Sequence, residues 1–167
     1  SSMSTTSAYA NYRLKIGKRI NLIAGGRYTY THIGANYIDS VLYDLPYERI
    51  DVNTNALTGS LGMAWDIGHQ FQINATIATA FRTPNIDDMA KLRAKGGNVT
   101  VPNPDIKPEK ALNTEISISK QFSQKVKISG TFFHTHLYDA VIQQDYSING
   151  ADTMYYDGRF RNIQALV

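Results

Sequence analysis

The chain of 167 residues contains no cysteine, which excludes a disulfide framework and any metal site built on thiolates. It contains no run of about 18 apolar residues, so the sequence also excludes a transmembrane helix. The formal net charge is only +3, with charges of both signs interspersed, and this bias is too weak to indicate a nucleic-acid partner.

Several functional motifs are also missing. The N-terminal residues show no basic segment followed by an apolar one, so we expect that a signal peptide was removed or that the chain is an internal piece. The sequence has no GxSxG elbow, no HExxH, no phosphate loop and no glycine-rich dinucleotide motif. His136 with Asp139 is the only local acid–histidine candidate. We therefore expect no catalytic residue and no cofactor, and a protein that is not an enzyme.

The feature that organises the chain is a near-strict alternation over residues 70–82. A two-residue period of this length predicts a strand whose two faces differ in polarity. One face is predicted to carry Phe71, Ile73, Ala75, Ile77, Thr79 and Phe81. The other carries mostly polar residues and ends in Arg82.

The spacing of the two phenylalanines indicates a membrane environment. At ~3.3 Å per residue and a tilt of roughly 40°, Phe71 and Phe81 lie about 25 Å apart along a membrane normal. This distance matches the apolar band between the two aromatic girdles of an outer-membrane barrel. Eleven tyrosines against one tryptophan also suit an interface where one end of a ring is dry and the other wet. The mean hydropathy of −0.30 does not contradict this, because only alternate residues of such strands face lipid.

Six further strands are predicted from the same alternation, and their connections alternate in length. Short turns are predicted at 17–19, 68–69 and 120–124, and long loops at 32–55, 82–110 and 143–157. Tight periplasmic turns and long extracellular loops are typical of outer-membrane barrels. Strands of twelve or more residues are long for a soluble β-sandwich. The sequence therefore predicts an all-β fold, an antiparallel up-and-down transmembrane β-barrel segment.

Seven strands cannot close a bacterial barrel, which has an even number and at least eight. An open sheet with one apolar face would also leave two unpaired edges. We therefore expect residues 1–167 to be part of one larger barrel domain, with further strands on both sides.

Two strings flank the second long loop, FRTPNIDD at residues 81–88 and PNPDIKPE at residues 102–109. They resemble the FRxPN-type start and the NPDLKPE-type return of an outer loop in the TonB-dependent outer-membrane receptor family. The strings KALNTEISIS and GTFFHTHLYDAVI that follow are similar to barrel strands of the same family. The resemblance covers most of the chain, as the C-terminal half of a receptor barrel.

The resemblance implies a barrel of about 22 strands with its lumen filled by a separate plug domain. It implies a bacterial outer-membrane location, active uptake of a scarce nutrient, and partners that include outer-membrane lipid and lipopolysaccharide. The plug and the segment that contacts TonB belong N-terminal to residue 1. Siderophore-iron, cobalamin, haem and a glycan all stay open as the ligand.

The two strings supply the candidate site residues. Prolines bias each preceding residue toward extended conformations, and asparagine or aspartate side chains cap local turns, so we expect a stiff strut. The residues expected to be architectural are Phe81, Arg82, Pro84, Asn85, Pro102, Asn103, Pro104, Asp105, Pro108 and Glu109. A direct ligand contact is the less favoured alternative, from Arg82, Asp87 or Asp88.

Histidine and lysine offer weaker candidates. His134 and His136 lie two residues apart and share a face, but two ligands make no metal site, and we expect them past the membrane band at a solvated rim. Some haem receptors of this family have a histidine between the two motifs, but none lies between Arg82 and Asn103 here. Haem is therefore a less favoured ligand than it would otherwise be. The basic loop residues Lys91, Arg93 and Lys95 are as readily solvated as bound to lipopolysaccharide.

The sequence leaves two other functions open. One is an outer-membrane barrel with a structural or adhesive role and no TonB coupling. The other is a soluble β-rich domain.

Overall fold

The computed structural model of the protein describes residues 2–36, 49–85, 88–89, 92–103 and 105–167. Within them, no helix is long and apolar enough to cross a membrane. The strands are β1 Ser2–Ile16, β2 Ile20–Asn36, β3 Arg49–Gly68, β4 Phe71–Arg82, β5 Arg93–Lys95, β6 Asn98–Val101, β7 Glu109–Gln121, β8 Lys127–Tyr138, β9 Gln143–Asp145, β10 Thr153–Tyr156 and β11 Arg159–Leu166.

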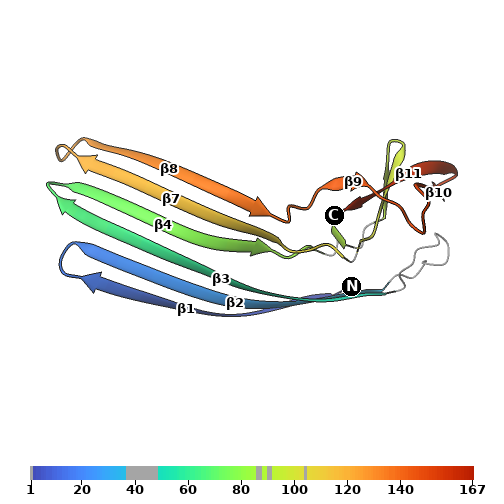
Figure 1. The fold of residues 1–167 in the computed structure, drawn as a ribbon, viewed down its shortest axis with the longest axis horizontal. Helices are drawn as coiled ribbons and strands as arrows, with labels where there is room; N and C mark the ends of the chain where they lie inside the picture. Colours follow the sequence, from blue (N-terminus) through green and yellow to red (C-terminus); the bar gives the residue numbers. More distant parts are fainter. Residues whose placement is uncertain (1, 37–48, 86–87, 90–91, 104) are drawn as a thin grey trace.

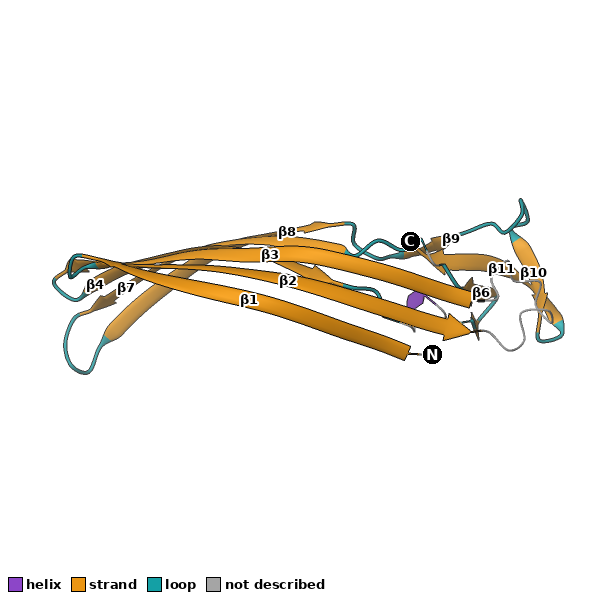
Figure 2. Ribbon diagram, turned by 90° about the horizontal axis from the view of Figure 1, so that it is seen from below, coloured by secondary structure: helices purple, strands orange, loops and turns teal. Residues whose placement is uncertain are grey.

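The long strands form one six-stranded sheet in the order β1-β2-β3-β4-β7-β8 (Figure 1). Every neighbouring pair is antiparallel, and the strands run from 12 to 20 residues. The tight turns that join them all lie at one end of the sheet, which we call the turn end; the opposite end is the loop end (Figures 1 and 2). The prediction of an all-β, antiparallel, up-and-down barrel segment is confirmed, and the barrel is not closed by these strands.

The register places the predicted apolar sides of all six strands on one side of the sheet. Directly opposed residues share a face, so a row across the strands samples that face. One such row is Leu14, Leu22, Met63, Ala75, Ile116 and Phe132. A row on the other side is Lys15, Asn21, Ala64, Asn74, Ser117 and Thr131. We call these two sides the apolar face and the polar face.

The tight turns use left-handed backbone at few positions. Gly17, with φ of 60°, opens the turn that ends at Arg19. His69 and Gln70, with φ of 53° and 58°, form the two-residue connection between β3 and β4. Two consecutive positive φ values are the geometry of a type I′ hairpin turn, which matches the twist of the flanking strands. The turns predicted at 68–69 and 120–124 thus lie at 69–70 and 122–126.

A second, smaller sheet lies beyond the loop end (Figure 2). Its strand order is β10-β11-β6-β5, and β9 pairs with β11 as well. The β11–β6 pair is parallel and joins segments that are distant in sequence. Four buried side chains form its core, Val99, Val101, Ile163 and Ala165. The second and third long connections therefore fold together into one β-structured lobe.

This lobe corrects several predictions. The last strand was expected in the barrel wall, but β11 belongs to the second sheet, so the long sheet has six strands among the described residues rather than seven. The loops predicted at 82–110 and 143–157 contain β5, β6, β9 and β10. These strands of three or four residues are stabilised by partners far along the chain, and local alternation over so few residues does not reveal them.

The loop predicted at 32–55 is also shorter than expected. The β2–β3 ladder continues through His32↔Asn53 to Asn36↔Arg49. Polar side chains occupy the apolar-face positions there, with Tyr30 Oη 2.7 Å and His32 Nδ1 2.9 Å from Asn53 Oδ1. Because hydrophobic alternation ends while backbone pairing goes on, the sequence pattern ends the strands too early.

An added charge should have a different effect on membrane insertion at each of the two faces of β4. Replacing Ile73 or Ile77 by aspartate puts a charge on the apolar face of β4, whereas Asn74→Asp puts it on the polar face. If the apolar face meets hydrocarbon, each isoleucine variant should lose a few kcal/mol at most in refolding into lipid vesicles. The Asn74 variant should change little, and equal losses at the two kinds of position would contradict the assigned faces.

Candidate functional site

The two strings predicted from the sequence meet at the loop end of the long sheet. The first begins at the end of β4 and the second ends at the start of β7. These strands are neighbours, and their register pairs Arg82 directly with Glu109. Both side chains are on the polar face, and the whole second long connection leaves and returns at this point.

The Arg82 guanidinium joins the strand ends to the connection above them. Its Nη1 lies 2.6 Å from Glu109 Oε2, and its Nη2 lies 2.6 Å from Asp88 Oδ2. The Arg82 side chain is half exposed, at 51%, while the two carboxylates are about one-fifth exposed. One cation thus bridges two acids that belong to different segments.

The chain after β4 turns sharply through a reciprocal pair of hydrogen bonds. The Asp88 backbone N–H donates to Asn85 Oδ1 at 2.7 Å, and the Asn85 N–H donates to Asp88 Oδ2 at 3.2 Å. This exchange is the pattern of a capping box at a helix start, and Asp88 and Met89 are helical. Pro84 is fully buried beneath this turn. Asp87 lies outside the described residues.

The returning segment is fixed by Asn103, which is only 5% exposed. Its Nδ2 donates to the Leu166 carbonyl at 2.8 Å, and its Oδ1 accepts the Asp105 N–H at 3.0 Å in an Asx turn. Its backbone N–H donates to the Met89 carbonyl at 3.1 Å. Asn103 therefore ties the return segment to the helical turn and to the end of β11. The neighbouring Pro102 is fully buried, and Pro104 lies outside the described residues.

A small hydrophobic cluster lies beneath these polar contacts. Ile33 of β2, Met89 and Ile106 are buried against one another, and Val141 and Leu166 pack on them. The cluster brings together one long hairpin and both later connections. Packing and hydrogen bonding thus hold the same region together. We call this region the junction, and its polar members are Arg82, Asn85, Asp88, Asn103 and Glu109.

The electrostatics of the junction favour the charged forms of its central pair. The Val141 backbone N–H donates to Glu109 Oε1 at 2.9 Å. This bond first, and the Arg82 guanidinium second, hold the pKa of the Glu109 carboxyl below its ordinary value. The pKa of Arg82 is raised, first by its hydrogen bond to Glu109 and then by the charge of Asp88. Both oxygens of Glu109 are therefore occupied by the protein itself.

The residues predicted to be architectural lie together. Arg82, Asn85, Asn103 and Glu109 carry hydrogen bonds of the junction, and Pro84 and Pro102 are buried in it. Arg82 and Asp88, offered as alternative ligand contacts, bind each other. Phe81 and Pro108 lie beside the junction and line a hollow of about 660 Å³ over the ends of β4 and β7.

The histidine pair lies elsewhere. His134 pairs with Thr114 and His136 with Leu112 on the apolar face of β8. In register, His136 lies two residues and His134 four residues on the turn side of the row that contains Phe81, Lys110 and Tyr138. Their expected position past the membrane band stays a prediction. Among the described residues, no three potential ligands gather around a possible metal position.

The sequence did not reveal a cavity of about 390 Å³ between the junction and the second sheet. It is lined by Asn85, Asp88, Arg93, Lys95, Thr100, Gln143 and Leu166. Gln143 is fixed there, because its Nε2 lies 3.0 Å from Thr100 Oγ1 and 2.9 Å from Gln164 Oε1. The cavity exists only because β5 and β6 fold against β11 and β9, which local patterns cannot predict.

Arg93 and Lys95 give this cavity a positive side. They lie two residues apart in β5, so both point to the same side of that strand. Both are exposed, and within the described part of the chain neither forms an ion pair. The basic loop residues noted in the sequence are thus two cations facing a hollow; the third, Lys91, lies outside the described residues.

Comparison with known proteins gives a family for the whole chain. A family model described as TonB dependent receptor-like, beta-barrel, matches residues 1–165. The vitamin B12 transporter BtuB of Vibrio vulnificus is 30% identical over 76 residues, which are 46% of this chain and 11% of that protein. The chain therefore spans about a ninth of the curated relative's length.

Solved structures share the fold at low sequence identity. A double mutant of the Serratia marcescens hemophore receptor HasR, in complex with its hemophore HasA and heme, matches 99% of this chain and 29% of its own, at 17% identity and a TM-score of 0.74. The FrpB iron transporter of Neisseria meningitidis matches 99% and 21%, at 19% identity and a TM-score of 0.62. The siderophore receptor PirA of Acinetobacter baumannii matches 98% and 32%, at 16% identity and a TM-score of 0.60.

The role of Glu109 can be tested at one amide. Glu109→Ala removes the acceptor of the Val141 N–H and one partner of Arg82. We expect hydrogen exchange at Val141 in the full-length protein to become about fivefold faster, a loss of about 1 kcal/mol for a partly exposed charged acceptor. Glu115→Ala, on the same face of β7, is the matched control and should leave this amide unchanged.

Acid should reproduce the effect of the variant. Because folding lowers the pKa of Glu109, its contribution is full above the ordinary value of about 4.3 and is lost as pH falls through the lowered pKa. The Val141 exchange ratio between variant and wild type should therefore approach one only in that acidic range. A ratio near one at neutral pH would mean that Glu109 does not hold this amide.

Proposed function

Because this chain belongs to the TonB-dependent receptor β-barrel family, as its two motifs indicated, we propose that it forms wall and outer rim of a receptor that imports a scarce nutrient across the bacterial outer membrane. Members of this family are transport receptors rather than enzymes. The observation that carries the proposal is the lobe at the loop end, where two long connections build a cavity with a positive side. Energy would reach the full receptor through TonB, by way of a plug domain outside this chain.

We place the turn end in the periplasm and the loop end outside the cell. The connections at the turn end are two to five residues long, while the connection after β4 and the chain after β8, both at the loop end, carry the second sheet. Short periplasmic turns and longer extracellular loops are the asymmetry of outer-membrane barrels. The lobe is then exposed to the medium, where a nutrient arrives.

The cavity favours a nutrient that carries negative charge. Arg93 and Lys95 face it without carboxylate partners among the described residues, while Asp88 is already paired with Arg82. Carboxylates and phosphates are the groups that such cations bind most strongly. Haem carries carboxylates, cobalamin carries a phosphodiester, and some ferric siderophores carry carboxylates, so we rank these nutrients above a neutral glycan.

Arg82, Asp87 and Asp88 keep a secondary place in this proposal. Arg82 and Asp88 hold the turn that forms one wall of the cavity, so they position it rather than supply free charge. Direct ligand contact by any of the three stays a less favoured proposal. The junction motif would then be shared by receptors with different ligands, and the lobe would select among them.

The orientation is tested by protease treatment of intact cells. We expect cleavage within the long connections at 37–48, 82–110 or 139–158 and none at the turns of the opposite end. The physical reason is that only the extracellular side is accessible to the protease. Cleavage at residues 69–70 in intact cells, with the long connections spared, would invert the assignment.

The cavity is tested by uptake in a deletion strain that carries the full-length receptor. Growth on defined iron, haem, cobalamin and glycan sources first identifies the nutrient. The double variant Arg93→Gln, Lys95→Gln should then weaken its binding about tenfold or more, since a charge-assisted contact is worth about 1.5–3 kcal/mol. Lys125→Gln, in the turn between β7 and β8, is the control. Equal effects of the cavity variant and the control variant would contradict a role of the cavity in binding. If the deletion strain without the receptor grew normally on every source, the uptake proposal itself would be wrong.

A further inference from the structure

A hollow of about 340 Å³ lies on the polar face at the turn end of the long sheet, far from the junction. Five strands and the tight turn after β1 contribute to its lining. Asn21, Gln72 and Ser119 line it, and the ladder rows place all three on the polar face. The volume is in the range of sites that hold one small molecule.

Three cations from two separate segments converge on this hollow. Lys18 and Arg19 come from the turn after β1, and Lys127 comes from the start of β8. Asp66 is the only acid in the lining, and its Oδ1 already accepts the Gly68 N–H at 2.9 Å. Within the described part of the chain, none of the three cations forms an ion pair or a side-chain hydrogen bond. The hollow therefore carries more positive than negative charge.

A buried hydroxyl in the same hollow also points to a ligand. Ser119 is only 7% exposed, yet its Oγ has no hydrogen-bond partner among the described residues. Ser117, two residues away on the same face of β7, differs because it accepts a hydrogen bond from Thr131 Oγ1 at 3.2 Å. Buried polar groups without a partner are rare, since each missing hydrogen bond costs free energy. A hydroxyl can donate, so Ser119 suits an anion that the three cations attract.

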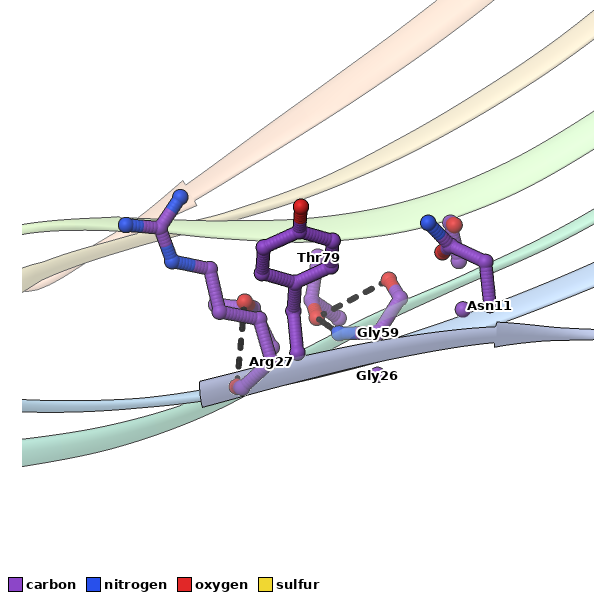
Figure 3. A pocket seen from close by; sticks show the side chains of 9 residues that line it. Asn11, Gly26, Arg27, Gly59 and Thr79 are labelled. Atoms are coloured by element: carbon purple, nitrogen blue, oxygen red, sulfur yellow. Dashed lines mark hydrogen bonds between the residues drawn. The ribbon is translucent and has the colours of Figure 1, made fainter. Parts of the chain in front are cut away.

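The hairpin of β1 and β2 concentrates positive charge on this face. Residues 2–36 contain no acid and five cations, which are Arg13, Lys15, Lys18, Arg19 and Arg27. Figure 3 shows Arg27 in a separate hollow of the polar face, nearer the loop end. The Ser7 and Thr29 hydroxyls accept hydrogen bonds from its guanidinium at 3.0 and 3.3 Å. Among the described residues, the hairpin cations without such partners therefore lie toward the turn end.

The chemistry of the lining selects the class of ligand. Ammonium and guanidinium groups bind carboxylates and phosphates most strongly, and a serine hydroxyl adds a hydrogen bond to either group. A lipid headgroup fits poorly, because the hollow is on the polar face, opposite to the face that meets hydrocarbon. The occupant that fits is a small molecule with one acidic group.

We propose that this hollow binds the carboxylate or phosphate group of a small molecule, with Lys18, Arg19 and Lys127 around the anion and the Ser119 hydroxyl donating to it. The site is distinct from the cavity at Arg93 and Lys95, which lies at the other end of the sheet. Its role rests on the proposed function, because the proposed orientation puts the hollow at the periplasmic mouth of the lumen. There it would hold the acidic group of the imported nutrient before release, and inorganic phosphate is the other source of the same chemistry.

Equilibrium dialysis of radiolabelled inorganic phosphate against the purified full-length receptor in detergent tests the site. The receptor carries Arg93→Gln and Lys95→Gln, so that the outer cavity does not contribute. Adding Lys18→Gln and Lys127→Gln should weaken phosphate binding about tenfold or more, because two charge-assisted contacts are lost. The matched control adds Arg13→Gln and Lys125→Gln instead. It removes the same charge toward the same end, outside the lining, and should change binding little.

The buried serine gives a test in which no charge changes. Ser119→Ala should weaken phosphate binding about fivefold or more, the usual effect of one lost hydrogen bond to a charged group. Ser117→Ala is its control and should leave binding unchanged, because that hydroxyl bonds to Thr131 and lies outside the lining. Thermal unfolding checks that each variant is folded.

Two results would overturn the anion site. One is equal phosphate binding by the Lys18, Lys127 variant and its control. The other is no phosphate binding by the receptor with an intact hollow, together with a lower unfolding temperature of the Lys18, Lys127 variant, which would show that an acidic group of the plug fills the hollow.

The nutrient identified by the growth tests then decides between the two sources of the anion. Competition between this nutrient and phosphate at the hollow supports a role in transport, whereas phosphate binding without competition overturns that role. The binding measurement does not depend on uptake. Absent phosphate binding with intact uptake would therefore contradict this inference alone, and normal growth without the receptor would contradict the transport proposal alone.

Discussion

The structure depends on backbone pairing that stays in register across six strands. A strand that crosses a bilayer has no water to satisfy its N–H and C=O groups, so its neighbours must. The ladder does this from β1 to β8 with a single shift, between Asp66 and Gly68 at a turn, except that the β3–β4 pairing ends at Ser60↔Ala78. Because a slip of one residue would exchange the two faces, the same ladder also keeps leucine, isoleucine and phenylalanine on one side. Pairing and polarity are thus one constraint rather than two.

Where this constraint ends, a different organisation begins. Beyond the Phe81 row the chain is free to expose polar groups to water, and the apolar-face positions of β2 and β3 change to His32, Asn53 and Asp51. The connections there pack on each other, with a buried core around Val99 and Ile163. The junction, with Arg82, Asp88 and Glu109 at its centre, lies at this boundary and joins the regular six-stranded sheet to the lobe. One arginine links a ladder that must be regular to a lobe that can vary.

The sequence predicts the part of the fold that repeats with a period of two. The faces of β1, β3, β4 and β7 follow from alternation, because each residue's environment there is set by its own strand. The second sheet could not be predicted from this alternation, because Val99 and Val101 are buried by β11, more than sixty residues away in the chain. Proline and asparagine alone led to the prediction that the two motifs are structural, and this stays a prediction. In the structure, Asn103 donates to the Leu166 carbonyl and accepts the Asp105 N–H. The cavity of Arg93 and Lys95 could not be predicted, since it needs three distant segments to meet.

The junction also explains why charged motif residues need not touch a ligand. Arg82 is half exposed, yet its two bound acids occupy both terminal nitrogens, and Glu109 uses its second oxygen on the Val141 amide. A ligand that took Arg82 would leave two carboxylates facing each other without their cation, a cost that a single new contact does not recover. Arg93 and Lys95 carry no such penalty among the described residues, because no acid of that part of the chain has to be released first. Ligand binding therefore costs less free energy at Arg93 and Lys95 in the lobe than at the junction. The junction is better suited to hold the lobe in place.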